Sequence, residues 1–232
     1  MKSGIVYPVE SESRLTDLRE NVDLPDGHEY DSLLEAIEIQ QEVELDSLQK
    51  DAQIGKIAVE RVVESDEVQI TEDLISEYTT EQKTTLATGF LYHPGNFFLI
   101  ANGSGKFATE VVNTHTEITV KDATINLDQF IQQKKNQNVE IDPWKVGFYG
   151  KRGLIENGVV HGDSVLDDDE IGGVLDITEK NQLGLDYEYQ SLPLRMFMAE
   201  SGYVEIYQPN DFTTAQFSEY LVNEIVPVLQ KK

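Results

Sequence analysis

Four consecutive residues have the types that bind anions at the start of a helix. They are Gly103, Ser104, Gly105 and Lys106. They follow the apolar run 97–101, and backbone N–H groups in such a loop can hold a phosphate while a lysine adds charge. The spacing departs from a P-loop, because Ile100 stands where the first glycine belongs and Phe107 replaces the magnesium-binding Ser or Thr. The pattern favours a tight strand-to-helix turn, with anion binding as the alternative.

An acidic region in the last third could hold a hard cation. The candidate ligands are His161, Asp163, Asp167 and Asp169. Carboxylate oxygens suit Mg²⁺ or Ca²⁺, but the run 167–170 lacks the alternating spacing of a calcium loop. The pattern favours a solvated acidic loop. A metal-dependent hydrolase or nuclease is the alternative, and it requires these acids to converge with Lys180 or His161.

A third group could contact nucleic acid. Lys145, Lys151 and Arg152 flank Phe148 and Tyr149, and cations beside aromatic rings can bind phosphates and stack bases. A capped hairpin explains the same residues, and the net charge of −25 makes nucleic acid an unfavourable partner for the chain.

Several kinds of chemistry have no support in the sequence. There is no cysteine, which excludes disulfides, thiolate catalysis and cysteine-ligated metals. No Gly-x-Ser-x-Gly elbow marks a nucleophile, and no cofactor motif is present. We therefore expect no cofactor and favour a protein that is not an enzyme.

The charge itself has two explanations. A net charge of −25 lies far outside the magnitude of roughly 2–8 that suits a small soluble domain. Adaptation to concentrated salt explains it, because screening in 1 M salt shortens the Debye length to about 3 Å. Imitation of the phosphates of DNA, to inhibit a nucleic-acid-binding protein, is the alternative. The ratio of 13 Lys to 5 Arg suggests an AT-rich gene, as on a virus or plasmid.

The charge is concentrated at the two ends of the chain. Residues 1–80 carry a net −15, residues 81–143 only −2, and residues 144–232 a net −8. The central part is therefore either core or a contact surface. We expect a protein partner or a second copy to bind region 85–125, through a sheet edge or an exposed aromatic such as Tyr92 or Phe107.

Hydrophobic periodicity predicts an α+β fold. Residues 36–45 alternate apolar and acidic side chains, which favours a half-buried strand, and 97–101 is apolar on both faces. Helices are expected over 127–135, after the cap Asn126, and over 213–229. Further expected elements are one or two helical turns within 13–21 and a strand over 117–125.

The elements together suggest mainly antiparallel sheets with helices packed on one face. Two stretches, 90–101 and 197–207, each read as a β-hairpin before a helix, so the fold could contain two such units. The polar stretch 137–143 is the linker candidate between an N-terminal region (1–136) and a C-terminal region (144–232).

The location is expected to be cytoplasmic, without membrane contact. No apolar window approaches the 18 residues of a membrane span, and the first residues lack the apolar core of a signal peptide. We expect a non-enzymatic interaction or structural protein adapted to high salt.

Overall fold

A single antiparallel sheet of eleven strands forms the frame of the molecule. The computed structural model describes residues 1–70, 75–152, 155–165, 172–175 and 177–231. From edge to edge the strands are β2 (Leu18–Asp23), β3 (Ser32–Val43), β4 (Ala52–Ile70), β5 (Ile75–His93), β6 (Phe97–Ile100), β1 (Ser3–Pro8), β12 (Tyr203–Gln208), β11 (Leu192–Ala199), β10 (Glu179–Tyr189), β8 (Ile141–Arg152) and β9 (Ile155–His161). The expected mainly antiparallel α+β fold is therefore confirmed.

The helices are short and stand between strands. They are η1 (Gly103–Gly105), α1 (Phe107–His115), α2 (Leu127–Asn136), α3 (Gly172–Leu175) and α4 (Thr214–Tyr220), which continues as η3 (Leu221–Ile225) and η4 (Val226–Val228). A separate two-stranded ladder pairs β7 (Ala123–Ile125) with β13 (Leu229–Lys231).

Strand β1 joins the two halves of the sheet. It pairs on one side with β6 and on the other with β12, so the first strand of the chain lies between two hairpins that are far apart in sequence. Successive side chains of a strand point to opposite faces, and accordingly Val6 and Tyr7 belong to different hydrophobic clusters.

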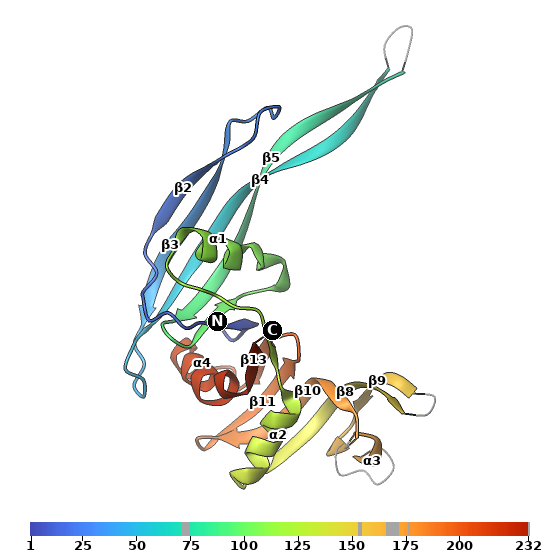
Figure 1. Cartoon of the computed structure of the whole chain (residues 1–232). Helices are drawn as coiled ribbons and strands as arrows, with labels where there is room; N and C mark the ends of the chain where they lie inside the picture. Colours follow the sequence, from blue (N-terminus) through green and yellow to red (C-terminus); the bar gives the residue numbers. More distant parts are fainter. Residues whose placement is uncertain (71–74, 153–154, 166–171, 176, 232) are drawn as a thin grey trace.

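Helices cover both faces of the sheet (Figure 1). Helix α1 packs with Phe107 and Val111 against strands β3 to β6 on one face. Helices α2 and α4 pack with Phe130 and Phe217 on the opposite face, mainly over β8 and β10 to β12. The helices are thus divided between two faces rather than gathered on one, because β6 and β1 are apolar on both sides.

The two strongest strand patterns are confirmed. Residues 36–45 lie largely in β3, and every residue of β6 is buried. Phe97 and Leu99 enter one cluster while Phe98 and Ile100 enter the other, which is why the run lacks a polar face.

The expected cap of α2 is also present. The side chain of Asn126 accepts a hydrogen bond from the backbone N–H of Gln129 at the start of α2. Thr213 caps α4 with a reciprocal bond to Gln216. The last helix is shorter than expected, since its regular α-helical part ends at Tyr220 and the chain from Leu229 is extended.

Two local expectations are wrong. Residues 13–21 form no helix, because Leu18–Asp23 pairs with β3 as the edge strand β2. Of the stretch 117–125, only Ala123–Ile125 is a strand. Both segments gain their backbone hydrogen bonds from partners distant in sequence, which periodicity does not reveal.

The linker candidate runs directly into the sheet. Residues 137–140 connect α2 to β8, while Ile141 to Pro143 already pair with β10. The division of the chain into two domains stays a prediction. Among the described residues, no helix has both the length and the apolar character needed to cross a bilayer.

Candidate functional site

The β4–β5 hairpin extends well beyond the rest of the molecule (Figure 1). Its two strands have 19 residues each, but only the part near their open end lies within the body of the protein. We call residues 60–70 and 75–88 the arm.

The arm exposes large apolar side chains far from either core cluster. Val68, Ile70 and Ile75 are 62%, 81% and 68% exposed. Ile70 pairs directly with Ile75, and Val68 lies two residues along the same strand, so the three side chains share one face. Val63 and Tyr78 are also exposed. Exposed apolar side chains grouped in this way indicate a contact surface.

Both long edges of the arm have backbone groups without a neighbouring strand. Strand β3 pairs with β4 only as far as Val59, and β6 pairs with β5 only from Phe90 to His93. Among the described residues, 60–70 and 75–85 therefore form strand pairs only with one another, and 86–88 pair only with 57–59 at the root of β4. Free strand edges are templates for the addition of another strand.

The outer part of the arm is acidic. Residues 62–70 and 75–82 contain five acids and no lysine or arginine: Glu64, Asp66, Glu67, Glu77 and Glu81. The two basic residues of the arm lie nearer the body and face it. The guanidinium of Arg61 is 5.9 Å from the ring centre of Phe107, and Lys83 Nζ is 4.9 Å from the ring centre of Tyr30.

The loop between β2 and β3 holds the arm in its middle. The backbone N–H of Glu29 donates to Glu81 at 2.9 Å, and the His28 ring contacts the same carboxylate at 2.7 Å. These bonds lower the pKa of Glu81. Lys83 Nζ donates to the carbonyl of Ser32 at 2.9 Å. Beyond this contact, side-chain hydrogen bonds of the described residues join the two strands of the arm, as between Tyr78 and Glu67 and between Thr79 and Asp66.

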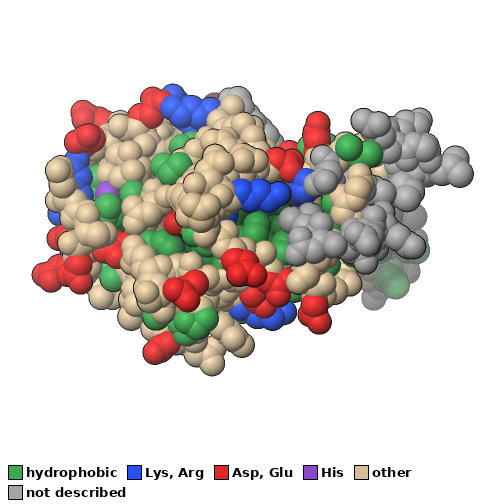
Figure 2. Space-filling model, turned by 90° about the horizontal axis from the view of Figure 1, so that it is seen from below, with side chains coloured by type: hydrophobic (Ala, Val, Ile, Leu, Met, Phe, Trp, Pro, Cys, Tyr) green, Lys and Arg blue, Asp and Glu red, His purple; other side chains and the backbone are tan. Residues whose placement is uncertain are grey.

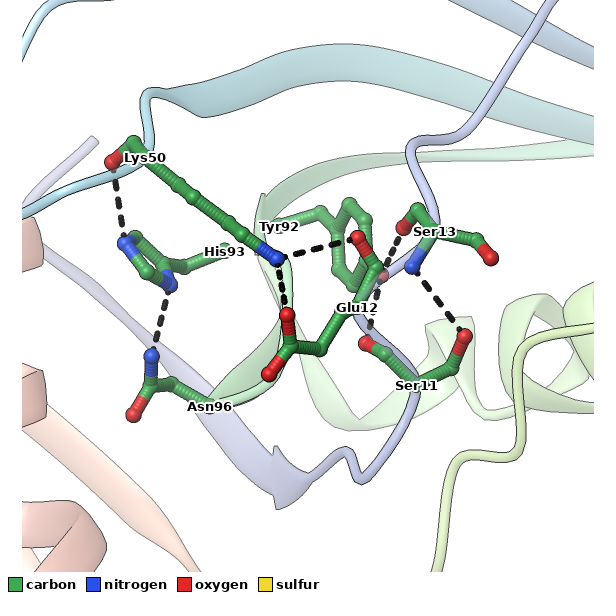
Figure 3. A network of polar contacts seen from close by, with 7 residues as sticks. All are labelled: Ser11, Glu12, Ser13, Lys50, Tyr92, His93 and Asn96. Carbon is green, nitrogen blue, oxygen red and sulfur yellow. Dashed lines mark hydrogen bonds and ion pairs between the residues drawn. The ribbon is translucent and has the colours of Figure 1, made fainter.

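A polar network fixes the root of the hairpin, buried at Tyr92 and His93 and exposed at Lys50 and Glu12 (Figure 3). The Tyr92 hydroxyl donates to the Ser13 carbonyl at 2.6 Å, and Lys50 Nζ binds Glu12 at 2.6 Å. Burial raises the pKa of Tyr92 above its usual range. The network ties the segment after β1 and the β3–β4 turn to the end of β5, so the arm starts from a rigid base.

His93 is the central group of this network. Its Nδ1 accepts a hydrogen bond from Asn96 Nδ2 at 2.9 Å, because an amide nitrogen only donates. The proton must then lie on Nε2, which donates to the Lys50 carbonyl at 3.1 Å. Burial lowers the pKa of the ring, so His93 is neutral and structural.

The Gly103–Lys106 segment forms the turn between β6 and α1. A side chain at Gly105 would place its Cβ 2.6 Å from Thr88 Oγ1, so close packing explains this glycine. Lys106 Nζ lies 3.6 Å from an Asp122 oxygen. Anion binding at Gly103, Ser104, Gly105 and Lys106 stays a prediction.

The candidate metal ligands are only partly described. His161 ends β9 and Asp163 follows it, while Asp167 and Asp169 lie outside the described residues. Within the described part of the chain, no three His, Asp or Glu side chains are arranged to hold a metal ion. The ligand set as a whole stays a prediction.

The candidate nucleic-acid residues are spread along β8. Lys145 Nζ lies 4.6 Å from the ring centre of Phe197. The backbones of Lys151 and Arg152 belong to the same strand, but their side chains lie outside the described part. Phe148 is buried, so it offers no stacking surface.

The exposed aromatics expected in region 85–125 are buried. Tyr92 is 0% exposed and Phe107 is 6% exposed. Tyr92 belongs to the root network, and Phe107 packs α1 onto the sheet. The prediction that these two rings form a contact surface is therefore wrong.

Sequence reasoning missed the arm as a unit. The available signal was two β-branched runs of equal length, 57–70 and 75–88, on either side of a short polar stretch. No protein-family model matches the chain, and no curated protein is significantly similar to it.

Proposed function

We propose that this chain is a non-enzymatic interaction protein, adapted to high salt, that binds a basic protein partner along its arm. The observation that carries the proposal is the arm itself, which combines exposed apolar side chains with two free strand edges. Neither feature contributes to the protein's own cores.

The charge of the arm favours a basic occupant. Its outer part holds only acidic charges, so a second acidic copy is repelled where a lysine- or arginine-rich segment is attracted. An extended segment with alternating basic and apolar residues would pair its backbone with an arm edge and place its apolar side chains near Val68 and Ile75.

High salt changes which interactions supply the affinity. At about 1 M salt the Debye length falls to roughly 3 Å, so charge attraction between exposed groups is weak. Backbone hydrogen bonds and apolar contacts then hold the partner, while the charges still disfavour acidic competitors at close range.

Binding of labelled peptides tests the proposal. The probes are a fluorescent peptide of about eight residues that alternates lysine and valine, and a counterpart that alternates glutamate and valine. We expect the basic peptide alone to bind, and the double variant Ile70→Ser, Ile75→Ser to weaken it about tenfold or more. A basic peptide with N-methylated backbone amides should bind poorly, because it cannot pair with a strand edge.

The matched control is Val159→Ser, which removes an exposed valine from β9 at the other end of the sheet. Equal weakening by Val159→Ser, or no effect of the arm variant, would contradict the proposal. Concentration-dependent dimerisation that the arm variant abolishes would also contradict it, because the occupant would then be a second copy.

A further inference from the structure

The turn between β6 and α1 contains a dipeptide that can react with itself. Asn102 is followed by Gly103, and the sequence has one other such pair, Asn157–Gly158 in β9. In an Asn–Gly pair the backbone nitrogen of the glycine can attack the side-chain amide of the asparagine, because no Cβ on the glycine obstructs the approach. The backbone around each pair then decides which of the two reacts.

The first pair lies in an exposed turn. Asn102 is exposed and directly precedes η1, which Gly103 begins. The nearest atom that a Cβ at Gly103 would meet is Ile5 Cδ1, at 3.6 Å, so the surroundings leave room for this peptide to rotate. Rotation toward the Asn102 side chain disturbs the 3.1 Å hydrogen bond from the Gly105 N–H to the Asn102 carbonyl. A bond at the exposed end of a three-residue helix opens at low cost.

Ser104 supplies a hydrogen bond that activates the amide. Its hydroxyl donates to Asn102 Oδ1 at 2.6 Å. This bond draws electron density away from Cγ and stabilises the negative charge that develops on Oδ1 when a nucleophile adds. It also folds the Asn102 side chain back toward the residues that follow it.

The second pair is held in the sheet. Asn157 pairs with Tyr149, and Gly158 pairs with Phe148, in the β8–β9 ladder. A Cβ at Gly158 would come 2.8 Å from the Phe148 ring, so this peptide lies tightly against its neighbour. Asn157 is itself exposed, so the contrast between the pairs comes from the backbone and not from the access of water.

We propose that Asn102 is a site of spontaneous deamidation, in which the backbone nitrogen of Gly103 closes a succinimide ring on the Asn102 side chain. The bond from Gly103 N to Asn102 Cγ forms, the Cγ–Nδ2 bond breaks, and the amide leaves as ammonia with the proton that Gly103 N gives up. Water then opens the ring. Cleavage at Cγ leaves an aspartate, and cleavage at the backbone carbonyl leaves an isoaspartate, in which the main chain runs through Cγ. Nothing is oxidised or reduced.

Either product changes the turn. A carboxylate replaces a neutral amide on a molecule whose surface already carries many acidic side chains, as the face seen from below shows (Figure 2). The added charge therefore increases self-repulsion. The isoaspartate also lengthens the main chain between β6 and α1, where Ile100 and Phe107 are buried. Deamidation thus alters the connection that positions α1 on the sheet.

Timed incubation of the full chain tests the site. Samples kept at pH 8.5 and 37 °C in 1 M KCl are digested with trypsin, which releases the two pairs on separate peptides, 84–106 and 153–180. Mass spectrometry with fragmentation measures how much of each asparagine has become an acid, and a sample taken at the start corrects for conversion during digestion. We expect Asn102 to convert at least tenfold faster than Asn157. In guanidinium chloride the ratio should fall to about threefold or less, because both backbones are then free.

Two variants test the roles of the neighbouring residues. Gly103→Ala places a Cβ in open space and should slow the conversion of Asn102 at least tenfold while leaving Asn157 unchanged. Ser104→Ala should slow it several-fold in the folded chain but not in guanidinium chloride. An unchanged rate in the folded Ser104→Ala variant would overturn the role of the serine.

Three results would overturn the proposal as a whole. One is equal conversion of Asn102 and Asn157 in the folded chain. Another is a rate at Asn102 that Gly103→Ala does not change. The third is a ratio in guanidinium chloride as large as that in the folded chain, because the fold would then not select Asn102.

Discussion

At the scale of single residues, His93 links the stability of the fold to pH. The ring is buried, its pKa is lowered, and both nitrogens already have partners that suit the neutral form. In the unfolded chain a histidine titrates near 6.5. The native state therefore binds fewer protons than the unfolded state once the pH falls below that value, and stability is lost as the pH falls toward the lowered pKa.

We predict that the free energy of unfolding drops between pH 7.5 and 5.5, with a slope of up to about 1.4 kcal/mol per pH unit from this one group. His93→Gln should be less stable at pH 7.5 but should show a flatter dependence. Urea unfolding followed by circular dichroism at several pH values measures both slopes. Identical slopes in the two proteins would show that other groups cause the dependence.

At the scale of elements, one buried ion pair connects two helices. Lys134 of α2 contacts Glu224 of the π-helical segment η3, and the Lys134 side chain is only 2% exposed. Its Nζ also lies 5.1 Å from the ring centre of Tyr187 and 5.4 Å from that of Phe130. The pair fixes how α2 and the α4–η3 helix meet over the sheet.

We predict that Lys134→Met costs about 3–5 kcal/mol of stability, because it leaves Glu224 buried without a counter-charge. The double variant Lys134→Met, Glu224→Leu should recover most of that loss. Lys135→Met, one residue further on the exposed side of α2, is the control and should change stability by less than about 0.5 kcal/mol. Chemical denaturation measures all three, and a double variant no better than the single one would refute a charge-burial cost.

Elements with local signals could be predicted, and elements that depend on distant partners could not. Strand β3 has alternating apolar residues in its sequence and α2 has its own cap, so both elements were foreseeable. The bulge between Ile39 and Gln41, which puts Ile37 and Val43 in different clusters, was not. Strand β2 has only Leu18 and Val22 as apolar residues, four apart, which fits a helix equally well. Its extended form comes from pairing with β3.

Neither the arm nor the placement of Trp144 could be predicted, and the reason is the same for both. The arm requires β4 and β5 to pair over their full length. A bulge where β8 meets β10 also turns Trp144 away from the side occupied by Val146. No sequence pattern within β4, β5, β8 or β10 taken alone indicates these contacts.

At the scale of the whole molecule, burial explains much of the neutral centre of the sequence. The segment 90–100 is almost wholly buried, and α1 buries further residues of the same region. Core positions exclude charge, so the low net charge of residues 81–143 needs no partner to account for it. The acidic excess instead lies on exposed positions of β2, β3 and the arm.

We also predict that salt stabilises the whole chain. With a net charge of −25, self-repulsion should destabilise the compact state in dilute buffer, and screening should relieve it. Most ion pairs of the described residues are exposed and contribute at most about 1 kcal/mol each, so their loss in salt is the smaller effect. Between 0.1 M and 3 M KCl we expect the Tm to rise by several degrees, where each 1 kcal/mol corresponds to about 2–4 °C. Sucrose at matched osmolality acts through its general exclusion from the protein surface and does not screen charge. It should therefore raise the Tm by less than KCl does. A chain that is fully folded at 0.1 M KCl and gains nothing from added salt would exclude salt adaptation as the reason for its acidity.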